Sequence, residues 1–445
     1  MLERFHQVVP AFYLACALPF VLILAWLSPP WSNPDEPAHM RRAVEIAHGE
    51  LLGFRRGLHD AGGLSDPAIT DANTPVDDLK FHPERKVTLP MLSASEQARW
   101  SPVLSAQSFP NTAQYPPTLY IPAALAVGIG QFTRLSVDRT LYLARAIGAV
   151  IAVLLSFIGI VLSRRTRYVL ATLAILPMTC TLDASVSQDG LMIALTILAV
   201  GWIDRIIERG FSAGGWEFLG LAVAIGCVAM ARPPYLPLVL LLPLASFRLR
   251  WPVILSVLAV IAATGAWSAL VADKIMITFP RADPTEQLKF LWAHPAHFGI
   301  LVLHNLQDLG GAYAIQFIGR LGWLDTALPF WYILFGCAVL ACGFLAAMSG
   351  ASHRAWLAFL AVAAAAFIVF AIQYVTWTPA EADHIDGIQG RYFIPLAAAF
   401  ALAIPGIRPL GSIFRPLAIA GLCVFGAITP FVTVQALVVR YYLGG

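Results

Sequence analysis

The sequence has few charged residues, and this scarcity excludes an ordinary soluble protein. Asp, Glu, Lys and Arg make up 12% of the 445 residues, whereas soluble domains usually carry about 25%. Hydrophobic residues make up 58% and occur in long runs, which predicts a protein that crosses a membrane several times. The net charge of +3 is small, so it does not indicate a nucleic-acid partner.

The polar stretches contain no cysteine, so we expect no disulfide framework in the loops. All six cysteines lie in apolar runs, and none has the paired spacing of a zinc site or a redox motif. We therefore predict that they are small packing residues. They are Cys16, Cys180, Cys227, Cys337, Cys342 and Cys423.

Apolar runs long enough for helices occur along the whole chain. No clear cleavage site follows the first run, so we predict an uncleaved first helix rather than a signal peptide. At roughly 20 residues per crossing, the chain predicts one all-α polytopic membrane domain, residues 1–445, with about 11–13 transmembrane helices. Arg4 favours a cytoplasmic start and hence an outer position for the following loop. The runs lie near 11–30, 116–133, 140–163, 168–184, 190–207, 214–231, 234–247, 251–272, 330–348, 354–376, 392–406 and 412–438.

Two stretches of mixed polarity interrupt these runs. Residues 31–115 contain eleven acidic and eight basic residues, and a structureless loop of this length is uncommon and usually functional. We predict a long periplasmic loop with short helices at the membrane surface, the first over about 34–51. The second stretch, 273–328, is typical of an amphipathic outer segment and contains Trp292 and several histidines.

The basic loop "SRRTRY", residues 163–168, conflicts with a simple alternation of crossings. Loops rich in Lys and Arg favour the cytoplasmic side, but two full crossings after an outer loop would place this one outside. Either the run 116–133 does not cross completely, or the loop departs from the rule.

The first candidate site lies in "PPWSNPDEPAHMRR", just beyond the first apolar run. A purely structural interpretation makes Asn33 a helix cap, with acids that complement the positive helix end. That interpretation does not explain His39, which a helix places on the same face as Asp35 and within reach of Glu36. Acids and an imidazole that converge at a bilayer surface can hold a metal or share a proton transfer.

Two further motifs add an aromatic residue and an acid. Tyr115 lies in "QYPPTLYIP", where the structural alternative is a helix start with tyrosines at the membrane interface. Asp189 lies in "TLDASVSQDG" together with Asp183. Acids between apolar runs are costly and often functional, although a solvated turn or a helix-start acid would also account for them.

The cations that face these acids come from later in the chain. Arg232 in "ARPPYLPL" and Arg320 in "QFIGRLGWLD" stand at the edges of apolar runs, where a guanidinium either extends to the interface or binds a phosphate. Arg391 in "DGIQGRYFIP" is the strongest basic candidate, because an unpaired cation that enters a span is expensive. Its structural alternative is a salt bridge to Asp386 or Asp383. The candidate substrate and phosphate residues are Arg391, Arg232, Arg320, Gln389, Tyr392, Asp189, His39 and Tyr115.

Together these residues predict a polar pocket at one face of a helical bundle. The motifs "NPDEPAH", "YPPTLY", "SQDG", "RPPYLPL", "GRLGWLD" and "QGRYFIP" occur in this order over nearly the whole chain. In this they resemble a bacterial family of uncharacterised multi-spanning membrane proteins, which is in turn similar to the C-type (GT-C) glycosyltransferase superfamily. The resemblance implies a GT-C-like bundle with a long helical first outer loop, in a bacterial inner membrane, with its active site toward the periplasm.

The resemblance also implies roles for the acids. Asp35 stands where the superfamily places its catalytic base, which takes the acceptor's proton as a sugar leaves its polyprenyl-phosphate donor with inversion. Glu36 and His39 would orient Asp35, or hold with it a divalent metal such as Mg or Mn. Asp189 matches the second acid of these enzymes. In the superfamily a spacer separates the first two acids, whereas Asp35 and Glu36 are adjacent, and this departure puts the metal in doubt.

The resemblance gives the arginines a role as well: Arg391, with Arg232 or Arg320, would hold the donor phosphate. The expected function is transfer of a sugar from a polyprenyl-phosphate donor to a glycan or lipid-linked acceptor, among membrane lipids. A transporter or flippase of lipid-linked glycans would use the same cations without a base. A structural membrane protein would need neither.

Overall fold

The computed structural model describes residues 2–210, 212–246, 250–277, 282–349, 355–379 and 382–443. The chain is 74% helical and 4% strand, which confirms an all-α polytopic membrane protein. Within the described residues, six helices are long and apolar enough to cross a membrane, and four apolar helices are shorter. The number of crossings, about 11–13 from the sequence, stays a prediction.

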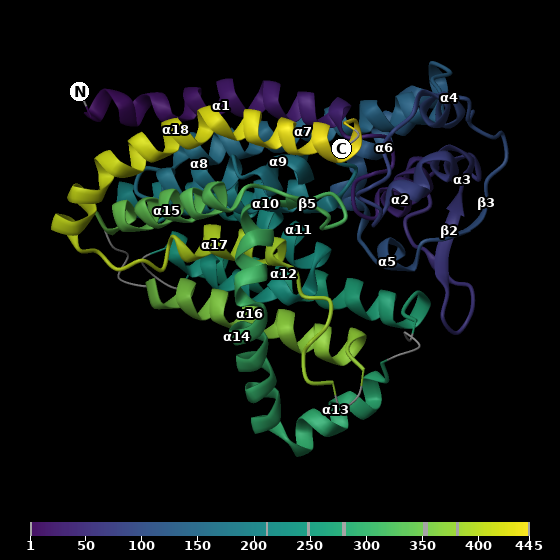
Figure 1. Cartoon of the computed structure of the whole chain (residues 1–445). Coiled ribbons are helices and arrows are strands. Elements are labelled where there is room, and N and C mark those ends of the chain that lie inside the picture. Colours follow the sequence, from purple (N-terminus) through teal and green to yellow (C-terminus); the bar gives the residue numbers. More distant parts are fainter. Residues whose placement is uncertain are drawn as a thin grey trace.

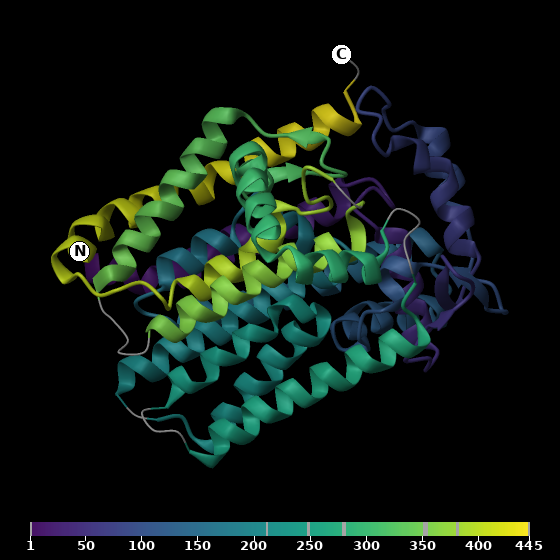
Figure 2. The ribbon, with the colours of Figure 1, turned by 90° about the horizontal axis from the view of Figure 1, so that it is seen from below.

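The long helices form an elongated bundle in which α1 and α18 lie side by side (Figures 1 and 2). The helix α14 runs across this direction in both views. The segment 273–328 contains this helix and the shorter α13. The long helices are α1 (Leu2–Leu27), α7 (Val137–Leu162), α10 (Gln188–Arg209), α12 (Trp251–Lys274), α14 (Pro295–Gly319), α16 (Ala355–Trp377) and α18 (Arg408–Tyr441).

Shorter elements connect the long helices. A two-stranded hairpin, β4 (Arg320–Leu321) with β5 (Thr326–Ala327), follows α14. The short helices are η2 (Pro117–Tyr120), α6 (Ile121–Phe132), α8 (Arg167–Ala174), α9 (Pro177–Asp183), α11 (Gly215–Ala231), η3 (Pro233–Ala245), α13 (Pro284–Ala293), α15 (Phe330–Ala346), η4 (Ala347–Ser349), η5 (Gly390–Phe393) and α17 (Ile394–Phe400).

Residues 31–115 fold as one polar segment at the end of the bundle away from the N-terminus (Figure 1). It contains short helices, as the sequence predicts, and also an antiparallel sheet in the order β1-β2-β3, which the pattern did not predict. The strand β2 carries Gly63, where any Cβ would collide with the Glu45 carboxylate. The elements are α2 (Glu36–Ala47), β1 (Phe54–Arg55), β2 (Ala61–Ser65), α3 (Ala68–Asn73), η1 (Thr74–Leu79), α4 (Leu89–Glu96), β3 (Ser105–Ser108) and α5 (Pro110–Ala113).

The helix α6 bears on the orientation conflict of the basic loop. Together with the preceding η2 it forms one apolar helix, Pro117–Phe132, of about 26 Å, which is somewhat shorter than the roughly 30 Å hydrocarbon core of a bilayer. Its buried residues belong to the same hydrophobic cluster as those of the polar segment, and Val137, the first residue of α7, donates its amide to Ala98 of that segment. This packing is the arrangement expected if the run 116–133 does not cross completely, and the crossing itself stays a prediction.

The basic loop is also bound closely to its neighbours. The Asp204 carboxylate accepts the backbone amides of Arg164, Arg165 and Thr166 at 2.9–3.1 Å. The Arg165 guanidinium donates to carbonyls at the end of α17, including that of Ile404 at 3.2 Å. The cations of this loop thus stabilise one end of the bundle.

A buried ion pair joins the polar segment to the bundle. Arg145 of α7 and Glu36 of α2 are both fully buried, with Nε 2.8 Å from Oε1 and Nη2 2.5 Å from Oε2. The remaining guanidinium hydrogens go to the carbonyls of Ala25, Ser28 and Pro29, just after and within the last turn of α1. All five donors are therefore satisfied, and one side chain fixes three segments.

The same ion pair moves the start of α2 away from its predicted position. The sequence predicts Asn33 as the cap, but α2 begins at Glu36, with Asp35 as the preceding residue in a left-handed conformation (φ 57°). The Asn33 amide instead donates to Glu36 at 3.1 Å. Because Glu36 must reach Arg145, the chain turns sharply at Asp35 before the helix can start.

We expect Arg145→Met to lower the free energy of unfolding by about 3–5 kcal/mol, because Glu36 would be left as an unpaired buried charge. Thermal unfolding in detergent would measure the loss. The matched control on the same helix is Arg139→Met, whose pair with Glu96 is exposed and should be worth at most about 1 kcal/mol. Equal effects of the two variants would contradict the structural role of the buried pair.

Candidate functional site

Seven of the predicted site residues gather where the polar segment meets the bundle. They come from five separate parts of the chain: α2, the loop before η2, the first turn of α10, the junction of α11 with η3, and η5. We call this group the polar cluster. Its members are Asp35, His39, Tyr115, Asp189, Arg232, Arg391 and Tyr392.

Asp189 forms the anionic centre of the polar cluster. The side chain is buried, in the first turn of α10. Nη2 of Arg232 donates to both carboxylate oxygens at 2.9 and 3.0 Å. Nε of Arg391 lies farther away, 3.8 Å from Oδ2, which is too long for a hydrogen bond. Arg391 therefore pairs electrostatically with Asp189, and not with Asp386 or Asp383 as the structural alternative had it.

Arg391 is aimed by the turn that carries it. The Gly390 amide donates to Oε1 of Gln316 at 2.8 Å, and a side chain at Gly390 would collide with the carbonyl of Tyr313 on α14. The carbonyl of Tyr392 accepts a hydrogen bond from Tyr235 at 2.7 Å. These contacts fix η5 between α14 and η3 and direct the guanidinium toward the cluster.

Tyr392 also supports Arg232. The guanidinium carbon of Arg232 lies 4.2 Å from the centre of the Tyr392 ring, and that of Arg391 lies 5.8 Å from it. Both distances are within the range of cation–π attraction. One aromatic ring therefore holds the two cations near each other despite their repulsion.

Asp35 and His39 form the other side of the cluster. Oδ1 of Asp35 accepts a hydrogen bond from the Asn111 amide at 2.8 Å, and the side chain is half-buried. The left-handed backbone of Asp35 is tolerated by Asp better than by most residues, but still carries strain. Such strain persists only where surrounding contacts enforce it, and here the enforcing contacts are those of Glu36 with Arg145 and of Asp35 with Asn111.

His39 is buried, and its Nδ1 lies 2.6 Å from the Tyr120 hydroxyl. Burial lowers the pKa of the His39 imidazole, while the nearby charges of Asp35 and Asp189 act in the opposite direction and that of Arg391 adds to the lowering. His39 is thus a neutral hydrogen-bonding group at neutral pH. These electrostatic effects also place the acid of the first loop and the arginine of η5 around one imidazole.

Tyr115 lies against the same imidazole. Its ring is nearly parallel to that of His39, with 6.2 Å between centroids. Desolvation raises the pKa of the Tyr115 phenol to about 12, so it remains a hydroxyl donor. Arg42 holds its carbonyl, with Nε and Nη2 donating at 3.1 and 2.9 Å.

A small cavity of about 10 Å³, enough for about one water molecule, lies beside the cluster. Within the described part of the chain, Nε of Arg391 is buried and has no hydrogen-bond partner, and this residue lines the cavity together with Pro34, the neighbour of Asp35. A buried donor of fixed charge without an acceptor is a place for an anionic oxygen. The lining residues are Asn33, Pro34, Met178, Thr181, Leu182, Ser185, Leu321, Gly322, Leu324 and Arg391.

Three predicted site residues have other positions. Glu36 is fully buried against Arg145 and does not face the cavity, so it positions α2 rather than meeting a substrate. The Arg320 guanidinium is exposed and donates to the Leu324 carbonyl at 2.7 Å, across the β4–β5 hairpin, so it is held on the hairpin and does not line the cavity. Gln389 contacts the cluster by its backbone, because its carbonyl accepts the amide of Tyr392 at 3.0 Å. Its buried side-chain Oε1 accepts no hydrogen bond from any described residue.

The predicted metal ligands Asp35, Glu36 and His39 are not brought together. Glu36 is held by Arg145, and the Nδ1 of His39 is engaged by Tyr120. Among the residues that the structure describes, no group of three or more His, Cys, Asp or Glu side chains is arranged to hold a metal ion. Asp35 is hydrogen-bonded to Asn111, whereas the adjacent Glu36 is bound to Arg145. The two carboxylates therefore point to different neighbours and do not bind one metal ion together with His39.

Sequence reasoning missed the residues that position the cluster. Asn111, Tyr120 and Tyr235 lie in or beside motifs that were singled out, but nothing in their type indicates a contact distant in sequence. Arg145 carried a usable signal, because it is a lone cation inside an apolar run, where charges are expensive and need a partner.

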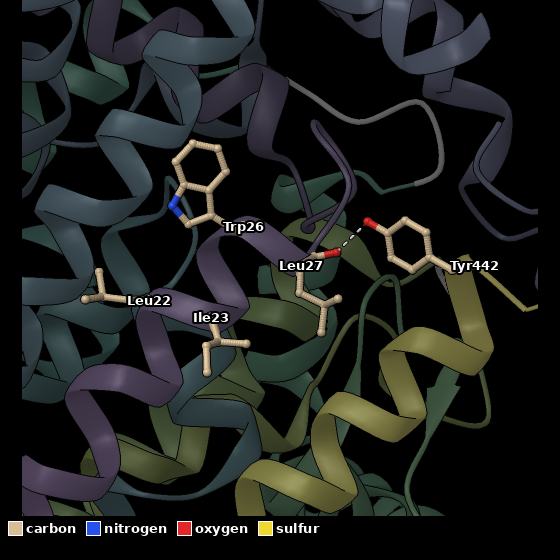
Figure 3. A pocket seen from close by; sticks show the side chains of 5 residues that line it. All are labelled: Leu22, Ile23, Trp26, Leu27 and Tyr442. Atoms are coloured by element: carbon tan, nitrogen blue, oxygen red, sulfur yellow. Dashed lines mark hydrogen bonds between the residues drawn. The ribbon is translucent and has the colours of Figure 1, made fainter. Parts of the chain in front are cut away.

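A second hollow lies on the outer surface, where α1 and α18 end near the polar segment (Figure 3). This groove has a volume of about 560 Å³ and is lined by Leu22, Ile23, Trp26, Leu27 and Tyr442. The Tyr442 hydroxyl closes one side by donating to the Leu27 carbonyl at 2.7 Å. Apart from that hydroxyl its walls are hydrocarbon and indole, which suits an apolar chain.

A family model described as "Predicted membrane protein (DUF2142)" matches residues 18–400. The matched range contains the polar segment, the whole polar cluster and all six motifs that carry the resemblance. No curated protein and no solved structure matches the chain.

The lowered pKa of His39 predicts a loss of stability in acid. Below its ordinary value of about 6.5 the unfolded chain binds a proton that folded His39 does not, so this contribution is complete above that pH and is lost as the pH falls. Melting temperatures between pH 7.5 and 5.5 should fall less for His39→Asn, which keeps a polar atom near Nδ1, than for the original chain. His48→Asn, at an exposed position, is the control, and parallel slopes for all three proteins would contradict the assignment.

Proposed function

The chain belongs to this family of predicted membrane proteins, and we propose that it is a glycosyltransferase. In this proposal it moves a sugar from a polyprenyl-phosphate donor to a glycan or lipid-linked acceptor. The observation that supports the proposal is the cavity lined both by Arg391, whose buried Nε has no hydrogen-bond partner among the described residues, and by Pro34, the neighbour of Asp35. The transfer requires a cation for the phosphate and a base for the acceptor hydroxyl, and Arg391 and Asp35 are groups of these types at or next to that cavity wall.

The reaction divides between the two sides of the cavity. The Asp35 carboxylate takes the proton of the acceptor hydroxyl as its oxygen forms a bond to the anomeric carbon. The bond from that carbon to the phosphate oxygen breaks on the opposite face, so the configuration inverts. The polyprenyl phosphate leaves with the bonding electrons, and Arg391 stabilises its negative charge. Arg232 stays paired with Asp189.

The surface groove supplies a place for the lipid tail. Tyr442 lines the groove. The hydroxyl of its neighbour Tyr441 lies next to Gly322, which lines the cavity, since a Cβ on Gly322 would be 3.0 Å from that hydroxyl. The groove and the cavity thus lie on the two sides of the end of α18. A polyprenyl chain on the outer surface would have its phosphate near the interior cluster.

The proposal includes an orientation in a bacterial inner membrane. The helix α7 starts at the polar segment and the basic loop 163–166 follows its other end, and the N-terminus also lies away from the polar segment (Figure 1). The excess of Lys and Arg favours the cytoplasm for that end. The polar cluster then faces the periplasm, where lipid-linked sugars would meet their acceptors.

The first test replaces the proposed base. We expect Asp35→Asn to lower the rate of transfer by at least about 10²-fold, because general base catalysis contributes about 10²–10⁴, while donor binding is retained. Release of polyprenyl phosphate, measured with purified protein in lipid and a panel of glycan acceptors, follows the reaction. The control is Asp71→Asn, an exposed aspartate of the same segment.

Two outcomes would contradict the base. Transfer by Asp35→Asn at the original rate would show that Asp35 is not the base. A donor that stays intact with the original chain across the whole panel would count against any transfer.

The second test compares two arginines. Arg391→Ala should weaken binding of the donor and lower transfer by about 10²-fold, the size usual for a lost charge-stabilising donor. Arg320→Ala removes a guanidinium that is exposed and does not line the cavity, and should leave both unchanged. If the two variants behave alike in a donor-binding assay, Arg391 is not the phosphate site.

A further inference from the structure

The motif "TLDASVSQDG" contains a second acid that the proposed reaction does not use. Asp183 is the last residue of α9 and is 3% exposed. Neither of its carboxylate oxygens has a hydrogen-bond partner within the described part of the chain. A carboxylate with two empty oxygens in a protein interior is rare and needs an explanation.

Among the residues that the structure describes, no cation pairs with Asp183 to balance a charge. Gly190 of α10 packs directly on it, since a Cβ at that position would lie 2.8 Å from Oδ1. Tyr13 of α1 and Cys180 of α9 are the groups near enough for its charge to act on them. The nearby arginines are committed elsewhere, Arg145 to Glu36 and Arg232 to Asp189.

Another buried acid in the same bundle shows how an ionised carboxylate is accommodated. Asp204 of α10 is fully buried, and one of its oxygens accepts three backbone amides and the Thr166 hydroxyl. Charge-assisted hydrogen bonds of this kind replace the lost water. Asp183 has none of them, so the ionised form is disfavoured and the neutral acid is the stable one.

We propose that Asp183 is a proton-binding site in the interior of the bundle, separate from the polar cluster. The carboxyl group holds its proton while α1, α9 and α10 pack around it. Thr181, Leu182 and Ser185 beside it line the cavity, so the neutral acid also keeps one cavity wall in place. A proton fits this site better than a hard metal cation does, because such cations need several oxygen ligands and the groups around Asp183 are a phenol, a thiol and a glycine.

Infrared difference spectroscopy of the purified protein tests the site directly. At pH 7.5 the spectrum of the original chain minus that of Asp183→Asn should contain the carbonyl band of one protonated carboxylic acid, shifted in D₂O. The same difference taken with Asp204→Asn should contain carboxylate bands instead. A carboxylate signal from Asp183 would overturn the proposal, and so would a carboxylic acid band that disappears on addition of NaCl, which would make the site one for a cation.

Thermal stability gives an independent readout that does not depend on any enzyme activity. Asparagine is a neutral isostere of the protonated acid, so Asp183→Asn should melt within a few degrees of the original chain, whereas Asp204→Asn should melt clearly lower. A large loss of stability on Asp183→Asn would indicate that the charged form is needed and would refute the proton site.

Discussion

The buried pair of Arg145 and Glu36 is the contact on which the rest of the structure depends. Two opposite charges taken fully out of water are costly, and they repay that cost only when every donor is satisfied. Here all five guanidinium hydrogens are used, on Glu36 and on carbonyls at the end of α1. The geometry of one arginine therefore sets where α1 stops, where α2 starts and how Asp35 must turn between them.

The polar cluster is built on the frame that this pair sets. Asp189 keeps Arg232 close and leaves Arg391 half satisfied, at a distance of 3.8 Å. One arginine is thus neutralised within the fold and the other is available at the cavity. A site with both cations paired would bind an anion weakly, and a site with neither paired would be costly to bury, so the unequal pairing is a workable compromise.

Much of the cluster could be predicted from the sequence, because charges are rare in this chain and each one beside an apolar run needed a reason. Asp35, Asp189, Arg232 and Arg391 were found in this way and do converge. Side-chain direction decided the other two cases. Glu36 is an acid like Asp35 but is buried against Arg145, and Arg320 is an arginine at the edge of an apolar run like Arg391 but is exposed. Residue type and spacing carry no information about such directions.

In the same way, the composition predicted the positions of the long helices but not the contacts between the shorter elements. Apolar runs located the long helices, and the length of the polar segment indicated that it is structured. The sheet β1-β2-β3 was missed because its strands are short and β2 contains two adjacent glycines, so they lack the alternation that identifies a strand. Composition alone predicts a crossing for the run 116–133, whereas the packing of α6 against the polar segment could be seen only in the structure.

The exposed side of α6 has a consequence for how the molecule is held. Leu125 and Phe132 of α6 are 59% and 88% exposed, so this helix turns large apolar side chains outward beside the polar segment. Acyl chains that shield these side chains from water would gain the free energy of their burial. The same contact would anchor the polar segment at a fixed depth relative to the lipid.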